Sequence, residues 1–231
     1  MSNTFKLLED RHHVIHYKEE VPPKEVVDKA LWEAWKTSPS KNNAMPWKVF
    51  VMGPEHKEEK IKVWRMIRGN HVDREKLAVE EGEATKTEGG WEGKQNPFYE
   101  HIKTGAYLFA IHAKPRQPNP FYKKQVEEGM YFDQAWESQI NKFIDTSAVE
   151  VGMFIQNLSS YLLEKDIDVS YTSCFYRDIK KWHDIGLNYA EYRPIILMTC
   201  GYAKSYRKDT ISSFAKREDK KPEYKEIVKW I

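Results

Sequence analysis

The sequence has little cysteine, no long apolar run and almost no net charge, and each absence excludes a class of protein. Its 231 residues contain two cysteines, Cys174 and Cys200, which lie far apart and form no CxxC pair. We therefore expect a reduced, cytosolic setting, although sequence alone leaves one disulfide between them open. No apolar run is long enough to cross a bilayer, and the first residues lack the apolar segment of a secretion signal. We therefore expect a cytoplasmic protein with no membrane partner.

The charges are close to balance, with 37 basic against 35 acidic residues. A balanced chain gives no electrostatic reason to expect nucleic acid or an anionic membrane as its main partner. Acidic residues also interleave with the lysines near the end of the chain, which is typical of a solvated surface. The sequence contains no GxGxxG, so it has no separate dinucleotide-binding motif of that kind.

The chain does contain a substantial core and a mixture of helical and strand patterns. Hydrophobic residues make up 40% of it and aromatic residues 13%, which is enough for one domain over residues 1–231. Periodicity predicts helices at about 23–36, 55–68 and within 136–165, and strands at 47–52, 107–112, 168–172 and 194–202. Because these elements alternate irregularly, the pattern favours an α+β fold over a regular βαβ series. The polar, glycine-rich segment 69–98 is expected to be a lid or cover.

The helix within 136–165 has the strongest pattern. One face is apolar at steps of three and four residues, through Ala148, Val151, Ile155, Leu158 and Leu162. The other faces are mostly small or apolar, through Val149, Gly152, Met153, Ser159 and Ser160. A helix that is apolar or small all round is buried all round, as in the centre of a large interface.

Four separated segments carry candidate functional residues. They are residues 11–17 (RHHVIHY), 38–47 (SPSKNNAMPW), 156–158 (QNL) with 170–175 (SYTSCF), and the closing stretch that begins with KKP at 220–222. Taken singly, each has an ordinary structural explanation, such as a solvated cluster, a helix stop or core packing. In this order and spacing they resemble the FMN-dependent nitroreductase family, over nearly the whole chain except about 55–98 and 113–135. The 38–47 segment is the most specific of the four.

The resemblance implies a nitroreductase-like fold, with a mostly antiparallel central sheet flanked by helices and a C-terminal segment that extends onto the partner subunit. It also implies a homodimer with FMN at the subunit interface. By position, Arg11, His12 and Lys220 would face the FMN phosphate or ribityl chain, with His13 in the place of the usual serine. Two cations of the family pattern are missing, because their positions hold Ile15 and Glu218.

The same resemblance assigns the rest of the flavin pocket. Pro39, Ser40 and Asn42 would complete it from the opposite subunit. Backbone N–H groups at Tyr171, Thr172 and Ser173 would face the isoalloxazine, and Ser173, as a donor near N5, is the candidate catalytic residue. A serine that merely satisfies the end of a strand is the alternative.

The histidines of the first segment also form an HHxxH pattern, in which His12 and His16 would share a face if the segment were helical. Without an identifiable third ligand, we expect no metal. The function implied is an FMN-dependent oxidoreductase in which NAD(P)H reduces FMN, and reduced FMN then reduces a nitroaromatic, quinone or similar acceptor in ping-pong order. The alternatives are a reductive dehalogenase or flavin-destroying enzyme of the same fold, and a non-catalytic flavin-binding dimer.

Overall fold

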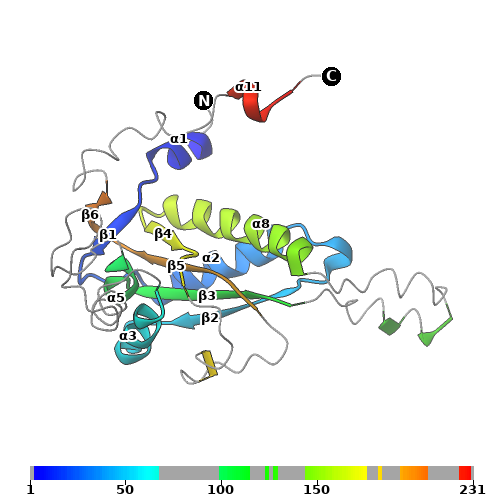
Figure 1. Ribbon diagram of the computed structural model, residues 1–231, viewed down its shortest axis with the longest axis horizontal. Helices are drawn as coiled ribbons and strands as arrows, with labels where there is room; N and C mark the ends of the chain where they lie inside the picture. Colours follow the sequence, from blue (N-terminus) through cyan, green and yellow to red (C-terminus); the bar gives the residue numbers. More distant parts are fainter. Residues whose placement is uncertain are drawn as a thin grey trace, which may run out of the picture.

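A computed structural model describes residues 3–67, 99–114, 123–124, 127–129, 144–175, 182–183, 193–207 and 224–229 (Figure 1). Helices and strands alternate irregularly along these residues, which confirms the α+β class. The expected lid at 69–98 and the proline-rich stretch at 115–120 lie outside the described residues. None of the described helices is both long enough and apolar enough to cross a membrane.

The central sheet has four strands in the order β2-β3-β5-β4, and each neighbouring pair is antiparallel. The strands are β2 (Trp47–Met52), β3 (Tyr107–Ala113), β4 (Asp168–Thr172) and β5 (Arg193–Gly201). The strands predicted at 47–52 and 168–172 have the predicted bounds. The apolar run predicted as one strand over 194–202 ends with β5, and β6 (Ala203–Tyr206) follows directly. β6 pairs with β1 (Val14–Tyr17) in a separate two-stranded sheet.

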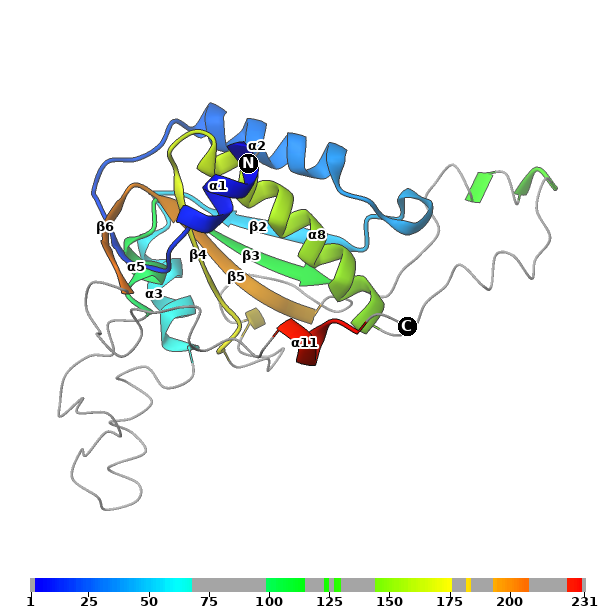
Figure 2. The same cartoon turned by 90° about the horizontal axis from the view of Figure 1, so that it is seen from above.

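The two faces of β3 explain how the layers form. Residues alternate between the faces of a strand, so β3 serves two cores at once. Tyr107, Phe109 and Ile111 pack with the helices α2 (Lys24–Thr37) and α8 (Ile144–Leu163). Leu108 and Ala110 pack on the other side, with α3 (Lys57–Arg65) and α5 (His101–Thr104). Figure 2 shows α2 and α8 lying together across the sheet.

Three shorter helices complete the described chain. α1 (Asn3–Asp10) precedes the first motif, the 3-10 helix η1 (Lys41–Asn43) lies within the second, and α11 (Tyr224–Ile227) lies near the C-terminus. The contacts of a C-terminal segment with a partner subunit remain an expectation.

α8 confirms one half of its predicted burial pattern. Its predicted core face is buried, with Val151, Leu158 and Leu162 wholly covered. The opposite face is open in the single chain, where 60% of Val149 and 43% of Met153 are exposed. An apolar helix face that the chain itself leaves uncovered is typical of an interaction surface.

Candidate functional site

The first motif meets β4, although about 160 residues of sequence separate them. The guanidinium carbon of Arg11 lies 5.0 Å from the centre of the Tyr171 ring. Nδ1 of His13 lies 3.0 Å from Oγ of Ser170, the preceding residue of the same strand. The fold therefore places Arg11 and His13 beside the strand that carries the expected isoalloxazine contacts.

The pairing of β1 with β6 fixes this arrangement. The N–H of Arg207 donates to the carbonyl of His13 at 2.8 Å, directly before β1 begins. The ring of His12 meets the edge of Tyr206, with ring centres 5.9 Å apart. His16 lies on the strand and its Nδ1 contacts Ser205 Oγ at 3.2 Å, so the helical reading of the HHxxH pattern is wrong. Within the described ranges, no three metal-ligating side chains come close enough to hold an ion.

A buried polar network supports the first motif from behind. The His13 ring packs against His101 with centres 5.1 Å apart, and Nδ1 of His101 lies 2.8 Å from Oγ1 of Thr199. The hydroxyl of Tyr17 donates to the carbonyl of Thr199 at 3.1 Å. Burial lowers the pKa of His101 well below its ordinary value and raises the pKa of Tyr17. Both groups are therefore neutral at physiological pH, and the network acts as a rigid support without charge.

His101 and Thr199 were not among the residues expected from the sequence. His101 is a lone histidine that follows the segment 69–98, and Thr199 lies within an apolar strand. Neither position forms a sequence pattern that would predict a polar contact. They meet because α5, which carries His101, directly precedes β3, and β3 pairs with β5, which carries Thr199.

β4 offers the backbone groups that the resemblance requires. Among the described residues it pairs only with β5, and the other edge of such a strand carries N–H and C=O groups that the ladder does not use. The Tyr171 hydroxyl is hydrogen-bonded to Ser159 on α8, which holds the ring that Arg11 covers. After the strand, the N–H of Cys174 donates to Oγ1 of Thr172 at 3.1 Å, so a tight turn places Ser173 at its tip.

The second motif lies elsewhere in the same chain. Oγ of Ser40 donates to Oε2 of Glu150 near the start of α8, at 2.7 Å. Glu150 lies nine residues before Ser159, which is about 13 Å along a helix. The Ser40 hydroxyl and the Tyr171 hydroxyl therefore contact α8 at points well separated along the helix. The side chain of Asn42 and all of Lys220 lie outside the described residues.

Comparisons with known proteins agree with this architecture. The family model described as the nitroreductase family matches residues 8–202. A structure assigned as a nitroreductase in complex with FMN, from Exiguobacterium sibiricum, superposes with a TM-score of 0.66 at 15% identity and covers 100% of this chain and 98% of its own. The enone reductase CLA-ER of gut-bacterial fatty acid metabolism has a TM-score of 0.57 at 15% identity, with coverage of 89% and 90%.

An iodotyrosine deiodinase bound to FMN and 3-iodo-L-tyrosine has the same TM-score of 0.57 at 17% identity, covering 88% of this chain and 91% of its own. No curated protein sequence matches the chain. At these identities the structural neighbours establish the fold, whereas the family model spans most of the sequence. The first motif, the 38–47 loop, α8 and β4 all fall inside the matched residues, and the chain belongs to the nitroreductase family.

Proposed function

We propose that this chain is an FMN-dependent oxidoreductase that works as a homodimer, using NAD(P)H as the electron donor. When bound, FMN would take a hydride from the nicotinamide and pass reducing equivalents to a small organic acceptor such as a nitroaromatic or quinone. The observation that carries the proposal is the meeting of Arg11 and His13 with β4. Support also comes from the family and from neighbours crystallised with FMN.

The described residues fit the phosphate end of a flavin nucleotide. A phosphate dianion needs forked or point cations, and Arg11 supplies a guanidinium whose central carbon lies over the Tyr171 ring, 5.0 Å from its centre. A guanidinium in such a contact can bind an anion through its N–H groups. His12 and His13 add ring N–H donors on the same short segment, and Lys220 would add a second cation.

The turn after β4 fits the isoalloxazine end. Backbone N–H groups at the open edge of the strand and at Ser173 would donate to the flavin ring, and the hydroxyl of Ser173 would add a donor near N5. In this scheme no side chain of the chain needs to act as acid or base. The protein contributes by positioning, because holding the donor or acceptor against the ring supplies most of the rate enhancement.

A second chain is part of the proposal because the resemblance assigns Pro39, Ser40 and Asn42 to the flavin pocket of the opposite subunit. The Ser40 hydroxyl contacts α8 at Glu150, about 13 Å along the helix from Ser159, which contacts Tyr171. The exposed face of α8, with Val149 and Met153, supplies an apolar surface for the second copy. Two chains packed on this face would each offer the 38–47 loop to the other.

The deciding experiment is an anaerobic titration followed by flavin absorbance. The purified protein should bind FMN, and NAD(P)H should bleach it. R11A should weaken FMN binding by about tenfold or more while changing riboflavin binding little, because riboflavin has no phosphate. R65A, which removes an exposed arginine of α3, is the matched control. A protein that ignores FMN would refute the proposal, and FMN binding without reduction would favour a non-catalytic flavin-binding dimer.

A second candidate is reductive dehalogenation. Two hydroxylic side chains, Thr172 and Ser173, lie at the turn where the flavin N5 would be, and the deiodinase is one of the structural neighbours. Turnover of a halotyrosine with dithionite as reductant would support this chemistry. No turnover would exclude it while leaving the FMN proposal intact.

A further inference from the structure

Glu150 is an acidic residue in a position that should cost free energy. It lies on α8 directly before the wholly buried Val151 and is only 7% exposed. A buried carboxylate persists only where hydrogen bonds or cations compensate it. Both of its oxygens face the 38–47 loop, because Oε2 accepts from Ser40 Oγ at 2.7 Å and Oε1 accepts from the N–H of Lys41 at 3.4 Å.

α8 holds the loop at a second point on the same face. Nδ2 of Asn157 donates to Oγ of Ser38 and to Oγ1 of Thr37, both at 3.2 Å. Glu150 and Asn157 are seven residues apart, so they lie two turns apart on one side of the helix. Two polar side chains of α8 therefore hydrogen-bond the loop and hold it against the helix. The adjacent face of α8 carries the exposed Val149.

The loop has a backbone shape that needs such support. Asn43 has a φ of 52° and Met45 a φ of 45°, both in the left-handed region. A long side chain such as methionine rarely adopts this region, and strained residues persist only where their surroundings fix them. The N–H of Met45 donates to Ser40 Oγ at 2.9 Å, so the chain of contacts runs from Glu150 through Ser40 to the strained residue.

We propose that Glu150 is a positioning residue that shapes the 38–47 loop for the flavin pocket of the partner subunit. The inference rests on the proposed function above. A serine hydroxyl has one proton to donate, and Ser40 donates it to Glu150. Ser40 therefore has no hydroxyl proton left for a flavin, and its part in the pocket is to hold the backbone of the loop. Each Glu150 serves the pocket of the other chain.

The local part of the inference is tested without FMN. E150Q keeps the size of the side chain, but an amide nitrogen cannot accept a hydrogen bond, so either the Ser40 O–H or the Lys41 N–H loses its acceptor. Hydrogen exchange at the amides of Lys41 and Met45 should become about tenfold faster. E33Q is the matched control, because Glu33 also links α2 to α8 through the Tyr161 hydroxyl. Unchanged exchange at both amides would overturn the positioning role.

The action on the partner's pocket is tested with mixed dimers of the full chain. E150Q homodimers should bind FMN about tenfold or more weakly than the natural protein. A dimer of one R11A chain and one E150Q chain should regain one site of natural affinity, because both defects fall in the same pocket. If Glu150 acted on its own chain's pocket, no such site would appear, which would overturn the inference.

The outcomes also separate this inference from the proposed function. A natural protein that binds no FMN would refute both the proposed function and the action on the partner. A natural protein that binds FMN, with E150Q binding it equally well, would refute only the role of Glu150.

Discussion

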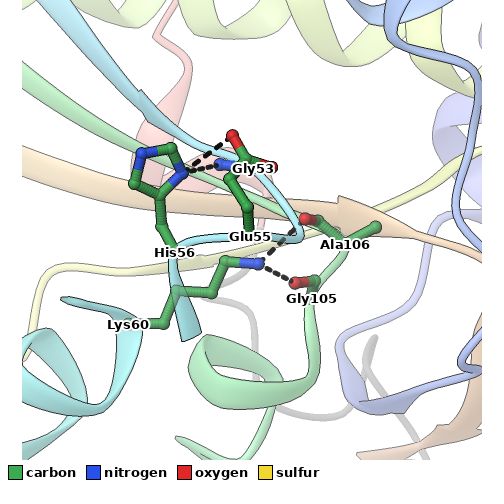
Figure 3. Close-up of polar contacts among 6 residues, drawn as sticks. All are labelled: Gly53, Glu55, His56, Lys60, Gly105 and Ala106. Carbon is green, nitrogen blue, oxygen red and sulfur yellow. Dashed lines mark hydrogen bonds and ion pairs between the residues drawn. The ribbon is translucent and has the colours of Figure 1, made fainter. Parts of the chain in front are cut away.

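Replacing Lys60 with methionine probes a buried amine that joins α3 to the start of β3. Lys60 is only 2% exposed, and its Nζ donates to the carbonyls of Gly105 at 2.8 Å and Ala106 at 2.9 Å (Figure 3). Burial lowers its pKa from 10.5 to about 8. The cause is desolvation, which disfavours the charged amine, and the neutral amine still has two N–H donors for the two carbonyls.

The pKa values determine how stability changes with pH. Between about pH 8 and 10.5 the unfolded chain holds the Lys60 proton more tightly than the folded chain does, so this residue makes the free energy of unfolding rise with pH. One pKa unit corresponds to about 1.4 kcal/mol, and the full difference is therefore about 3 kcal/mol at most. Tyr17 and Cys200 act in the opposite direction, because burial raises their pKa values and ionisation at high pH favours the unfolded chain.

Comparison with K60M isolates the lysine from these opposing groups. Methionine keeps the length and apolar contacts of the side chain but has no donor. We expect the stability advantage of the natural protein over K60M to grow by about 2–3 kcal/mol from pH 7.5 to 10, measured by urea unfolding at each pH. K62M, at an exposed position of α3, should show no such growth. A difference that stays constant or shrinks with rising pH would refute the assignment of a depressed pKa to Lys60.

Three further changes test the packing around the site. Y171F removes the hydrogen bond to Ser159 and should lower the free energy of unfolding by about 1 kcal/mol in urea titrations, whereas no loss would show that the contact contributes nothing. Burial lowers the pKa of His112 to about 3, so the free energy of unfolding falls as the pH drops below 6.5. H112F should reduce the slope of unfolding free energy against pH by about 1.4 kcal/mol per pH unit. An unchanged slope would contradict this. G201A would place Cβ 2.9 Å from the Tyr17 ring, so its thermal midpoint should fall by several degrees, and an unchanged midpoint would show that the ring can move.

The elements that could be predicted from the sequence are those with a long regular pattern. β2 and β3 are largely apolar runs, β4 alternates polar residues with Val169 and Tyr171, and α2 follows two prolines and repeats its apolar residues at helical spacing. β1 and β6 have four residues each, which is too short for periodicity to detect. Their pairing joins residues 14 and 206, and a contact between distant segments leaves no mark in local spacing.

The candidate site was predictable as a set of segments but not as a set of contacts. The order of the motifs indicated that Arg11 and Tyr171 belong to one pocket, and the fold places them together. The support from His101 and Thr199 could not be predicted, because neither residue belongs to a motif. Glu150 did leave a signal, since an acidic residue within an otherwise apolar or small helix needs a polar partner. The sequence could not show that this partner is the 38–47 loop.

The missing cation at position 15 has a physical reason in this fold. Ile15 lies on β1 and is wholly buried, as is its neighbour Val14. An arginine or lysine there would have to be buried without compensation or displace the strand, and either change is costly. The cationic candidates of this segment lie before β1 begins, at Arg11, His12 and His13. His13 stands where the family pattern has a serine, directly before the buried strand β1, and its ring adds a nitrogen there. The contact between His13 Nδ1 and Ser170 Oγ on β4 fixes the position of that ring.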